Sequence, residues 1–143
     1  MRTIEIQGRY YELASLMERW VGQFLDGLIF IVIFIVGILL NSITGLTLGT
    51  VIGVVAAILY LLFQDGLTNG QSWGKKIMKT KVIDSRTSVP CTFGQSFLRN
   101  LLLTILSWID WVFIFGEKRQ RLGDRAAHTL VVKLHESSEE QEA

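Results

Sequence analysis

Five ionisable residues lie inside or at the ends of long apolar stretches of this chain. Arg19 and Asp26 are seven residues apart, so they would share one face of an α-helix. The same holds for Arg99 and Asp110, which are eleven residues apart, and Asp65 follows directly after another apolar run. A carboxylate within a membrane helix can bind a proton or a cation, and a neighbouring arginine would shift its pKa. The sequence therefore predicts a candidate ion or proton site formed by Asp26, Asp65, Arg99 and Asp110.

Two of these residues also have simpler explanations. Arg19 stands next to Trp20, a pair typical of an interfacial anchor, since arginine extends toward the headgroups and tryptophan favours that level. Asp65 is equally what a solvated helix end would carry. For Asp26 we favour a functional role, because an ionisable group that faces the interior of a helix bundle is costly to place there.

Other kinds of site find little support. Residues 70–76, Gly-Gln-Ser-Trp-Gly-Lys-Lys, have three residues between the glycines instead of the four of a phosphate loop, so we interpret the lysines as contacts to lipid headgroups. His128 and His135 have no partners at metal-ligand spacing, and no nucleophile stands at a recognisable spacing from a base. We expect no metal, no cofactor and no enzymatic activity. Fourteen basic and thirteen acidic residues nearly cancel, so net charge gives no indication of nucleic-acid binding.

The elements that would position these residues are membrane helices. Half of all residues are hydrophobic, and residues 21–40 and 43–63 form two apolar runs separated only by Asn41 and Ser42. Each run is close to the ~20 residues that cross ~30 Å of hydrocarbon. The two runs predict a tight helical hairpin. A third apolar segment follows, so we expect an all-α membrane protein with membrane segments at about 20–40, 43–63 and 97–115.

Small residues recur along the second run. Gly45, Gly49 and Gly53 are spaced four residues apart and Ala57 continues the series, a pattern that lets another helix approach closely. The partner is either the first run or a second subunit. The stripe is therefore the indication in the sequence of a homo-oligomer or of a membrane partner protein.

The distribution of lysine and arginine predicts the orientation in the lipid bilayer. Basic residues before the first run and after the second place the N-terminus and the following loop in the cytoplasm. The third segment conflicts with this rule, because it is basic on both sides and one crossing cannot return to the side it left. We favour three crossings. The alternative is a break near residues 107–111 that makes the third segment re-entrant.

The remaining stretches are expected on the cytoplasmic side. Residues 1–18 mix charged and apolar residues and predict a short strand or an amphipathic lead-in at the membrane surface; no cleaved signal peptide is expected. Residues 79–84 and 128–134 are β-prone and predict a small sheet, whereas residues 135–143 are acidic and predict a disordered tail. Cys91 is the single cysteine, so no intramolecular disulfide can form.

Three groups of residues together resemble one family. They are an Arg and an Asp in the first membrane segment, the glycine-lysine loop at residues 70–75, and a tail motif at residues 120–132, Gln-Arg-Leu-Gly-Asp-Arg-Ala-Ala-His-Thr-Leu-Val-Val. The chain resembles the RDD family of small bacterial and archaeal membrane proteins over about residues 15–134, within a membrane domain taken as 19–134. The resemblance implies an inner-membrane location, a polar cluster of Arg19, Asp26 and Asp124, and loop and tail motifs that include Gly70, Gln71, Gly74, Lys75, Arg121, Gly123 and Thr129. The sequence departs from the family at His128, where glycine is usual, and at Ser72, where threonine is common.

Two functions follow from these observations. The first is a non-enzymatic assembly or accessory protein, in which the charged residues form a lock at the cytoplasmic membrane face that fixes the loop and tail for a partner protein. The second is an oligomeric cation/proton antiporter, an activity that the resemblance suggests for some family members. We favour the first, because it uses more of the motif residues and because most candidate ion ligands cluster at the inner boundary.

Overall fold

The computed structural model describes residues 2–45 and 47–134, so the predicted acidic tail lies outside the described residues. The described part is mostly helical with two small sheets, and the predicted fold class is confirmed to that extent. In chain order the elements are β1 Thr3–Ile6, β2 Arg9–Glu12, α1 Leu16–Thr44, α2 Leu48–Phe63, α3 Trp73–Ile77, β3 Thr80–Asp84, α4 Phe93–Leu106, α5 Trp108–Val112, the 3-10 helix η1 Phe113–Phe115, α6 Leu122–Ala126 and β4 Thr129–Lys133.

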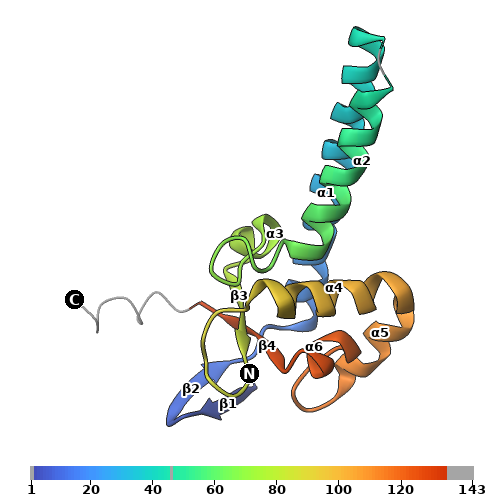
Figure 1. Cartoon of the computed structure of the whole chain (residues 1–143). Helices are drawn as coiled ribbons and strands as arrows, with labels where there is room; N and C mark the ends of the chain where they lie inside the picture. Colours follow the sequence, from blue (N-terminus) through green and yellow to red (C-terminus); the bar gives the residue numbers. More distant parts are fainter. Residues whose placement is uncertain (1, 46, 135–143) are drawn as a thin grey trace, which may run out of the picture.

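Helices α1 and α2 form a hairpin that projects from a compact body (Figure 1). Helix α1 begins at a capping box, in which Glu18 N donates to Ser15 Oγ at 3.1 Å and Ser15 N donates to the Glu18 carboxylate at 2.7 Å. It ends at Thr44, and its C-cap Gly45 has a φ of 67°, the left-handed conformation that favours glycine. The turn therefore lies further along the chain than Asn41 and Ser42, where the sequence predicts it.

The glycine stripe packs the two helices of the hairpin against each other. A Cβ atom on Gly53 would lie 2.5 Å from the Cα atom of Gly37, and one on Gly49 would lie 2.6 Å from the backbone N of Asn41. Ala57 is 1% exposed in the same contact region of α2. Gly45 lies outside this contact, at the end of α1. Of the two partners that the sequence left open, the stripe thus contacts the first helix of the same chain.

The outer surface of the hairpin is apolar. Large side chains such as Val32 and Leu39 of α1 and Val51 and Ile52 of α2 are about half exposed. Among the described residues, α1 is the one continuous helix that is both long enough and apolar enough to cross a membrane. The bent pair of α4 with residues 109–115 is a second candidate if the pair counts as one span. Helix α2 is apolar but shorter, with 16 residues.

The body brings together the two ends of the third predicted segment. Strand β3 precedes this segment and pairs antiparallel with β4, which follows it, in a register that aligns Val82 with Val131. The predicted pairing of the two β-prone runs is thus confirmed. Leu13, just before α1, forms a bridge with Val132, so the start of the chain joins the same side of the body. Residues 1–18 contain the β1–β2 hairpin, one of the two forms expected there.

The third segment is not one straight helix. Helix α4 ends at Leu106, because its C-cap Ser107 has a φ of 49° and a ψ of −124°, which cannot continue an α-helix. The axis then turns by 110° between α4 and residues 109–115. Figure 1 shows α4 lying across the base of the hairpin. The expectation of three spans is not confirmed, and the break falls where the re-entrant alternative places it.

Candidate functional site: a buried charge network

Eight charged side chains meet at the base of the hairpin and are almost fully removed from solvent. Four are aspartates that are 0% exposed and four are cations that are at most 7% exposed. They come from six different parts of the fold: α1, the end of α2, α3, α4, α5 and the start of α6. We call this set the charge network, and its members are Arg19, Asp26, Asp65, Lys75, Arg99, Asp110, Arg121 and Asp124.

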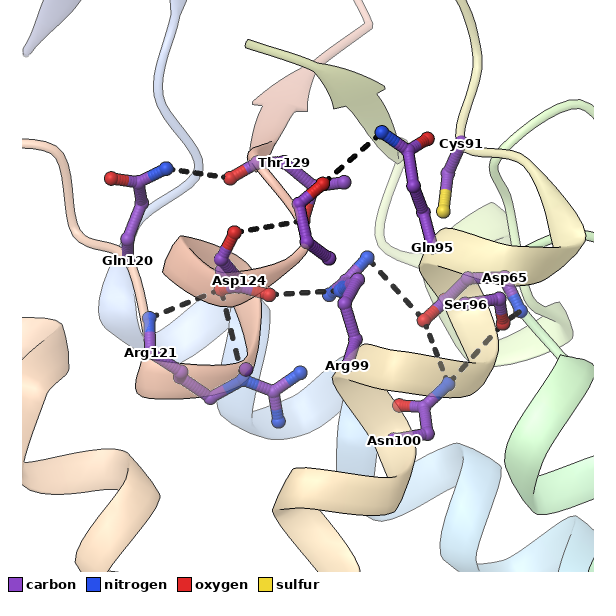
Figure 2. Close-up of polar contacts among 12 residues, drawn as sticks. Asp65, Cys91, Gln95, Ser96, Arg99, Asn100, Gln120, Arg121, Asp124 and Thr129 are labelled. Atoms are coloured by element: carbon purple, nitrogen blue, oxygen red, sulfur yellow. Dashed lines mark hydrogen bonds and ion pairs between the residues drawn. The ribbon is translucent and has the colours of Figure 1, made fainter.

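Asp124 is the point where most of the network converges. Arg99 Nε lies 2.8 Å from its Oδ1 atom, and Arg19 donates to its Oδ2 atom. The backbone N of Arg121 donates to the same carboxylate at 3.1 Å, which closes the first turn of α6. Gly123 makes this approach possible, because a Cβ there would lie 2.6 Å from the carbonyl oxygen of Arg99. Figure 2 shows Arg99 reaching from α4 toward Asp124 on one side and Asp65 on the other.

Asp65 links the end of α2 to α3 and α4. Lys75 Nζ lies 2.7 Å from one carboxylate oxygen, and the other accepts from Asn100 Nδ2 at 3.2 Å and lies 3.4 Å from Arg99. Burial raises the pKa of Asp65, but the charges of Lys75 and Arg99 outweigh it and lower the pKa to about 2. The pKa of Asp124 is also held well below its usual range, since Arg99, Arg19 and Arg121 outweigh the effect of burial.

Asp26 binds the glycine-lysine loop. Its carboxylate accepts from Ser72 Oγ at 2.5 Å and from the backbone N of Gly74 at 2.9 Å, and Lys75 Nζ lies 3.5 Å away. Gly74 is required for this contact, because a Cβ there would lie 2.2 Å from the carbonyl oxygen of Gly22 in α1. Lys75 is therefore an internal ion-pair partner, whereas the sequence led us to expect a headgroup contact.

Arg19 and Asp26 share a face of α1 but bind different segments. Arg19 donates to Asp124 and to the carbonyl oxygen of Arg119, near the tail motif, whereas Asp26 binds the loop. The arginine and the aspartate of the first predicted membrane segment thus bind two separate motifs to one helix. Gln71 of the loop motif lies outside the network and donates to the carbonyl oxygen of Thr80 at 2.9 Å.

The remaining predicted residues complete the tail side. Asp110 accepts from the backbone N of Gly123 at 2.8 Å and lies 3.7 Å from Arg121 Nε. Thr129 Oγ1 donates to the carbonyl oxygen of Asp124 at 3.4 Å. At Gly70, the φ of 81° and a Cβ position 2.2 Å from the carbonyl oxygen of Val82 leave room for glycine alone.

Sequence reasoning missed four polar residues that contact the network, one of which is Ser72, the donor to Asp26 described above. Tyr60 donates to Asp26 at 3.1 Å, Ser96 Oγ accepts from the backbone N of Asp65 at 3.2 Å, and Asn100 binds Asp65 as described. A signal was present for two of them. Ser96 and Asn100 lie three residues before and one residue after Arg99, within residues 96–103, which are otherwise apolar, and all three are 0% exposed.

The network is electrically balanced. Its four aspartates and four cations neutralise one another, so the body can exclude water there without leaving a net buried charge. Each carboxylate is occupied by partners from this chain. The arrangement is suited to holding the glycine-lysine loop, α4 and the tail motif of residues 120–132 against the hairpin. Among the described residues, no group of three or more His, Cys, Asp or Glu side chains is placed to hold a metal ion.

A long apolar helix and a hairpin with a largely exposed apolar surface are features of a membrane-associated protein. The sequence matches the RDD family over residues 13–128, and the chain belongs to that family. An "uncharacterized protein" of Haemophilus influenzae is 30% identical over 129 residues, which cover 84% of this chain and 78% of the relative. A "proline-rich antigen homolog" of Mycobacterium tuberculosis and a "proline-rich antigen" of Mycobacterium leprae are 32% and 34% identical, and the chain covers only 36% and 30% of their lengths. No solved structure shows a significant match.

The structure shows what the departure of this sequence from the family at His128 means for the backbone. The φ of His128 is 53°, in the left-handed region that favours glycine. Glycine, the usual family residue, would adopt this conformation without strain. Histidine at this position therefore raises the energy of the local backbone but leaves the charge network unchanged.

Proposed function

We propose that this protein is a non-enzymatic membrane assembly or accessory protein of the bacterial or archaeal plasma membrane. In this proposal the α1–α2 hairpin crosses the bilayer twice, and the charge network holds the body as a rigid platform on the cytoplasmic face. The platform, built from β1–β4, α3 and α6, is the surface offered to a partner protein.

The observation that carries the proposal is that every ionised member of the network is paired within the chain. An ion-exchange site needs a carboxylate that can release its partner to a cation or a proton. Here Asp26 and Asp65 share Lys75, while Asp65 and Asp124 share Arg99. Opening one of these pairs would leave a buried charge uncompensated, at a cost of ~3–5 kcal/mol. Such a network favours holding a shape over exchanging ions.

The pairing of β3 with β4 supports two crossings. Because β3 precedes the third segment and β4 follows it, both ends of that segment belong to one side of the membrane. The bend at Ser107 lets α4 and α5 begin and end there, and the bridge between Leu13 and Val132 adds the N-terminus to that side. This topology also satisfies the positive-inside rule for all three basic regions.

The glycine stripe limits where a second subunit or a membrane partner protein could bind. Gly37, Gly49 and Gly53 are used for contacts within the hairpin, so they are not free to pack a second subunit. A homo-oligomer or a membrane partner would have to bind elsewhere, on the outer hairpin surface or on the platform.

The assembly function is tested in native membranes. On native gels of mildly solubilised membranes, the wild type should migrate as part of a larger complex. Arg99→Gln, which opens the network, should remain inserted but migrate alone. The matched control is Arg86→Gln, since the Arg86 side chain is 66% exposed and its nearest carboxylate is 3.9 Å away. Wild type that migrates alone in native membranes would overturn the assembly function.

Transport is tested separately with purified protein in sealed vesicles that contain a pH-sensitive dye. Imposed Na⁺ or K⁺ gradients should cause no proton flux beyond that of empty vesicles. Flux that appears with the wild type and is lost in Asp26→Asn would replace the assembly function by antiport.

A further inference from the structure

An open apolar groove lies beside the start of α1, away from the charge network. Its volume is about 530 Å³, within the range of small-molecule sites. One wall is Leu16, Met17 and Trp20 of α1, and the other includes Trp111, Val112 and Phe115 of α5 and η1. Met17 and Phe115 are 69% and 74% exposed. Contact of such side chains with water would be unfavourable, so we expect an apolar group to occupy the groove.

Two arginines lie beside Gly116, the residue that follows Phe115 of the groove. Phe115 is followed by Gly116, whose carbonyl oxygen accepts from the Arg2 guanidinium at 3.1 Å. A terminal nitrogen of Arg125 lies 3.0 Å from the Cβ position of the same glycine, and the Arg125 guanidinium lies over the Phe113 ring at 5.6 Å. Two guanidiniums that start from opposite ends of the chain thus converge next to Phe115.

These arginines are available to an external anion. Both are exposed, and among the described residues neither has a carboxylate partner. The four cations of the charge network, by contrast, are paired with the four buried aspartates. Glu117 is adjacent in sequence, but Arg2 contacts its carbonyl oxygen at 3.5 Å and not its carboxylate.

The direction of the groove matches that of a lipid in the inner leaflet. Along α1, Leu16 is at the platform end and Trp20 is about one turn nearer the hairpin, where it stacks on Phe24 at 5.6 Å between ring centroids. Tryptophan favours the headgroup level of the bilayer. An acyl chain lying along the groove would have its headgroup at Arg2 and Arg125 and its tail directed along Trp20 and Phe24 into the hydrocarbon.

We propose that this groove binds one anionic phospholipid of the cytoplasmic leaflet, with the acyl chain between α1 and α5 and the phosphate on Arg2 and Arg125. The proposal rests on the cytoplasmic position of the platform given above. The occupant is a lipid and not a second copy of the chain, because the apolar groove and the paired cations match the two parts of one amphipathic molecule. Bound there, the lipid would fasten the loop after η1 to the start of α1.

The test uses tryptophan fluorescence quenched by bromine atoms on lipid acyl chains. The full chain carries Trp73→Phe and Trp108→Phe, so that Trp20 and Trp111 in the groove give the signal. It is reconstituted in phosphatidylcholine vesicles that contain a small equal fraction of either brominated phosphatidylglycerol or brominated phosphatidylcholine. The brominated anionic lipid should quench more strongly, with an apparent enrichment of roughly tenfold over the neutral one.

Two double variants separate a site from general surface charge. Arg2→Gln with Arg125→Gln should remove the excess quenching. Arg9→Gln with Arg86→Gln removes the same charge from exposed positions elsewhere and should leave the excess in place. Equal loss in both double variants, or equal quenching by both lipids in the parent protein, would overturn the lipid site.

Two further outcomes are distinguishable. If inorganic phosphate abolishes the excess quenching, the arginines bind a free anion and the lipid proposal fails. If neither brominated lipid quenches at all, the platform does not lie at the bilayer, and the two-crossing arrangement fails together with the lipid site.

Discussion

At the scale of single residues, the network distributes its charge through shared partners. Lys75 serves both Asp26 and Asp65, and Arg99 serves both Asp65 and Asp124. Removal of one shared cation therefore leaves two carboxylates short of a partner. A fully buried group loses more than an exposed one in this situation, because water cannot replace the lost contact.

Arg99→Gln should accordingly destabilise the protein by about 3–5 kcal/mol, since it leaves an uncompensated negative charge in the network. Arg86→Gln removes an exposed arginine 3.9 Å from Asp84 and should cost less than about 1 kcal/mol. Denaturant unfolding in detergent micelles, followed by near-ultraviolet circular dichroism, measures both. Equal losses in the two variants would mean that the Arg99 ion pairs contribute no more than a surface pair.

A double-mutant cycle tests which residues are partners. Arg19→Ala and Asp124→Ala should be coupled, with the double variant less destabilised than the sum of the single changes, because each single change strands the other charge. Arg19→Ala and Asp26→Ala should be nearly additive, since the two side chains bind different segments. The reverse pattern, with coupling to Asp26 and none to Asp124, would contradict the structure.

Acid should weaken the network. The pKa of Asp65 falls from 3.8 to about 2 on folding, so the unfolded chain binds more protons than the folded one in this range. Stability from Asp65 is therefore complete above pH ~4 and is lost as the pH falls toward ~2, by an amount on the order of 2 kcal/mol, and Asp124 acts in the same direction. Unfolding midpoints measured at decreasing pH should drop less steeply for Asp65→Asn than for the wild type. Parallel curves would show that Asp65 is not held by its partners.

At the scale of elements, the sequence predicts the local structure of several segments, but it does not predict which segments the charged side chains bind. The strands at 79–84 and 128–134 were expected from β-branched runs, and they pair as β3 and β4. The four-residue glycine spacing gave the packing face of α2. The sequence could not tell that Arg19 and Asp26 would diverge to two motifs, because that depends on where α3 and α6 fold back. Nor did it identify Lys75 as buried, since a lysine in a glycine-rich loop is normally solvated.

The hairpin depends on contact between backbones. Gly53→Ala places a methyl group 2.5 Å from the Cα atom of Gly37, so α2 must move away from α1 and the α1–α2 contact should be lost. The matched control is Gly27→Ala, where nothing lies within 4 Å of the new atom and the better helix propensity of Ala should stabilise by up to about 1 kcal/mol. Thermal unfolding in detergent should rank Gly27→Ala at or above wild type and Gly53→Ala clearly below. A neutral Gly53→Ala would mean that the helices are not in close contact there.

At the scale of the whole molecule, the second helix of the hairpin is shorter than a bilayer is thick, so in the proposed arrangement the body would cover the remaining depth. Helix α2, with 16 residues, is about 24 Å long, against ~30 Å of hydrocarbon. Below it, α4 turns a polar face with Arg99 and Asn100 inward and leaves Phe97 and Ile105 exposed. With apolar side chains outside and charges inside, the base of the hairpin suits the interfacial layer. The network would then lie at the level of the cytoplasmic headgroups, which agrees with its internal charge balance.

This placement predicts which parts of the chain face each side of the membrane. Single cysteines are introduced at Gln7, Thr47, Thr87 and Ala126, one before α1, one at the hairpin tip, one before α4 and one after η1. In intact cells, a membrane-impermeant maleimide should label Thr47→Cys alone, and the other three should react only after the cells are opened. Native Cys91 is 4% exposed and should contribute little background. Labelling of Ala126→Cys from outside would show that the third segment crosses the bilayer, which would put β3 and β4 on opposite sides of the membrane and contradict their pairing.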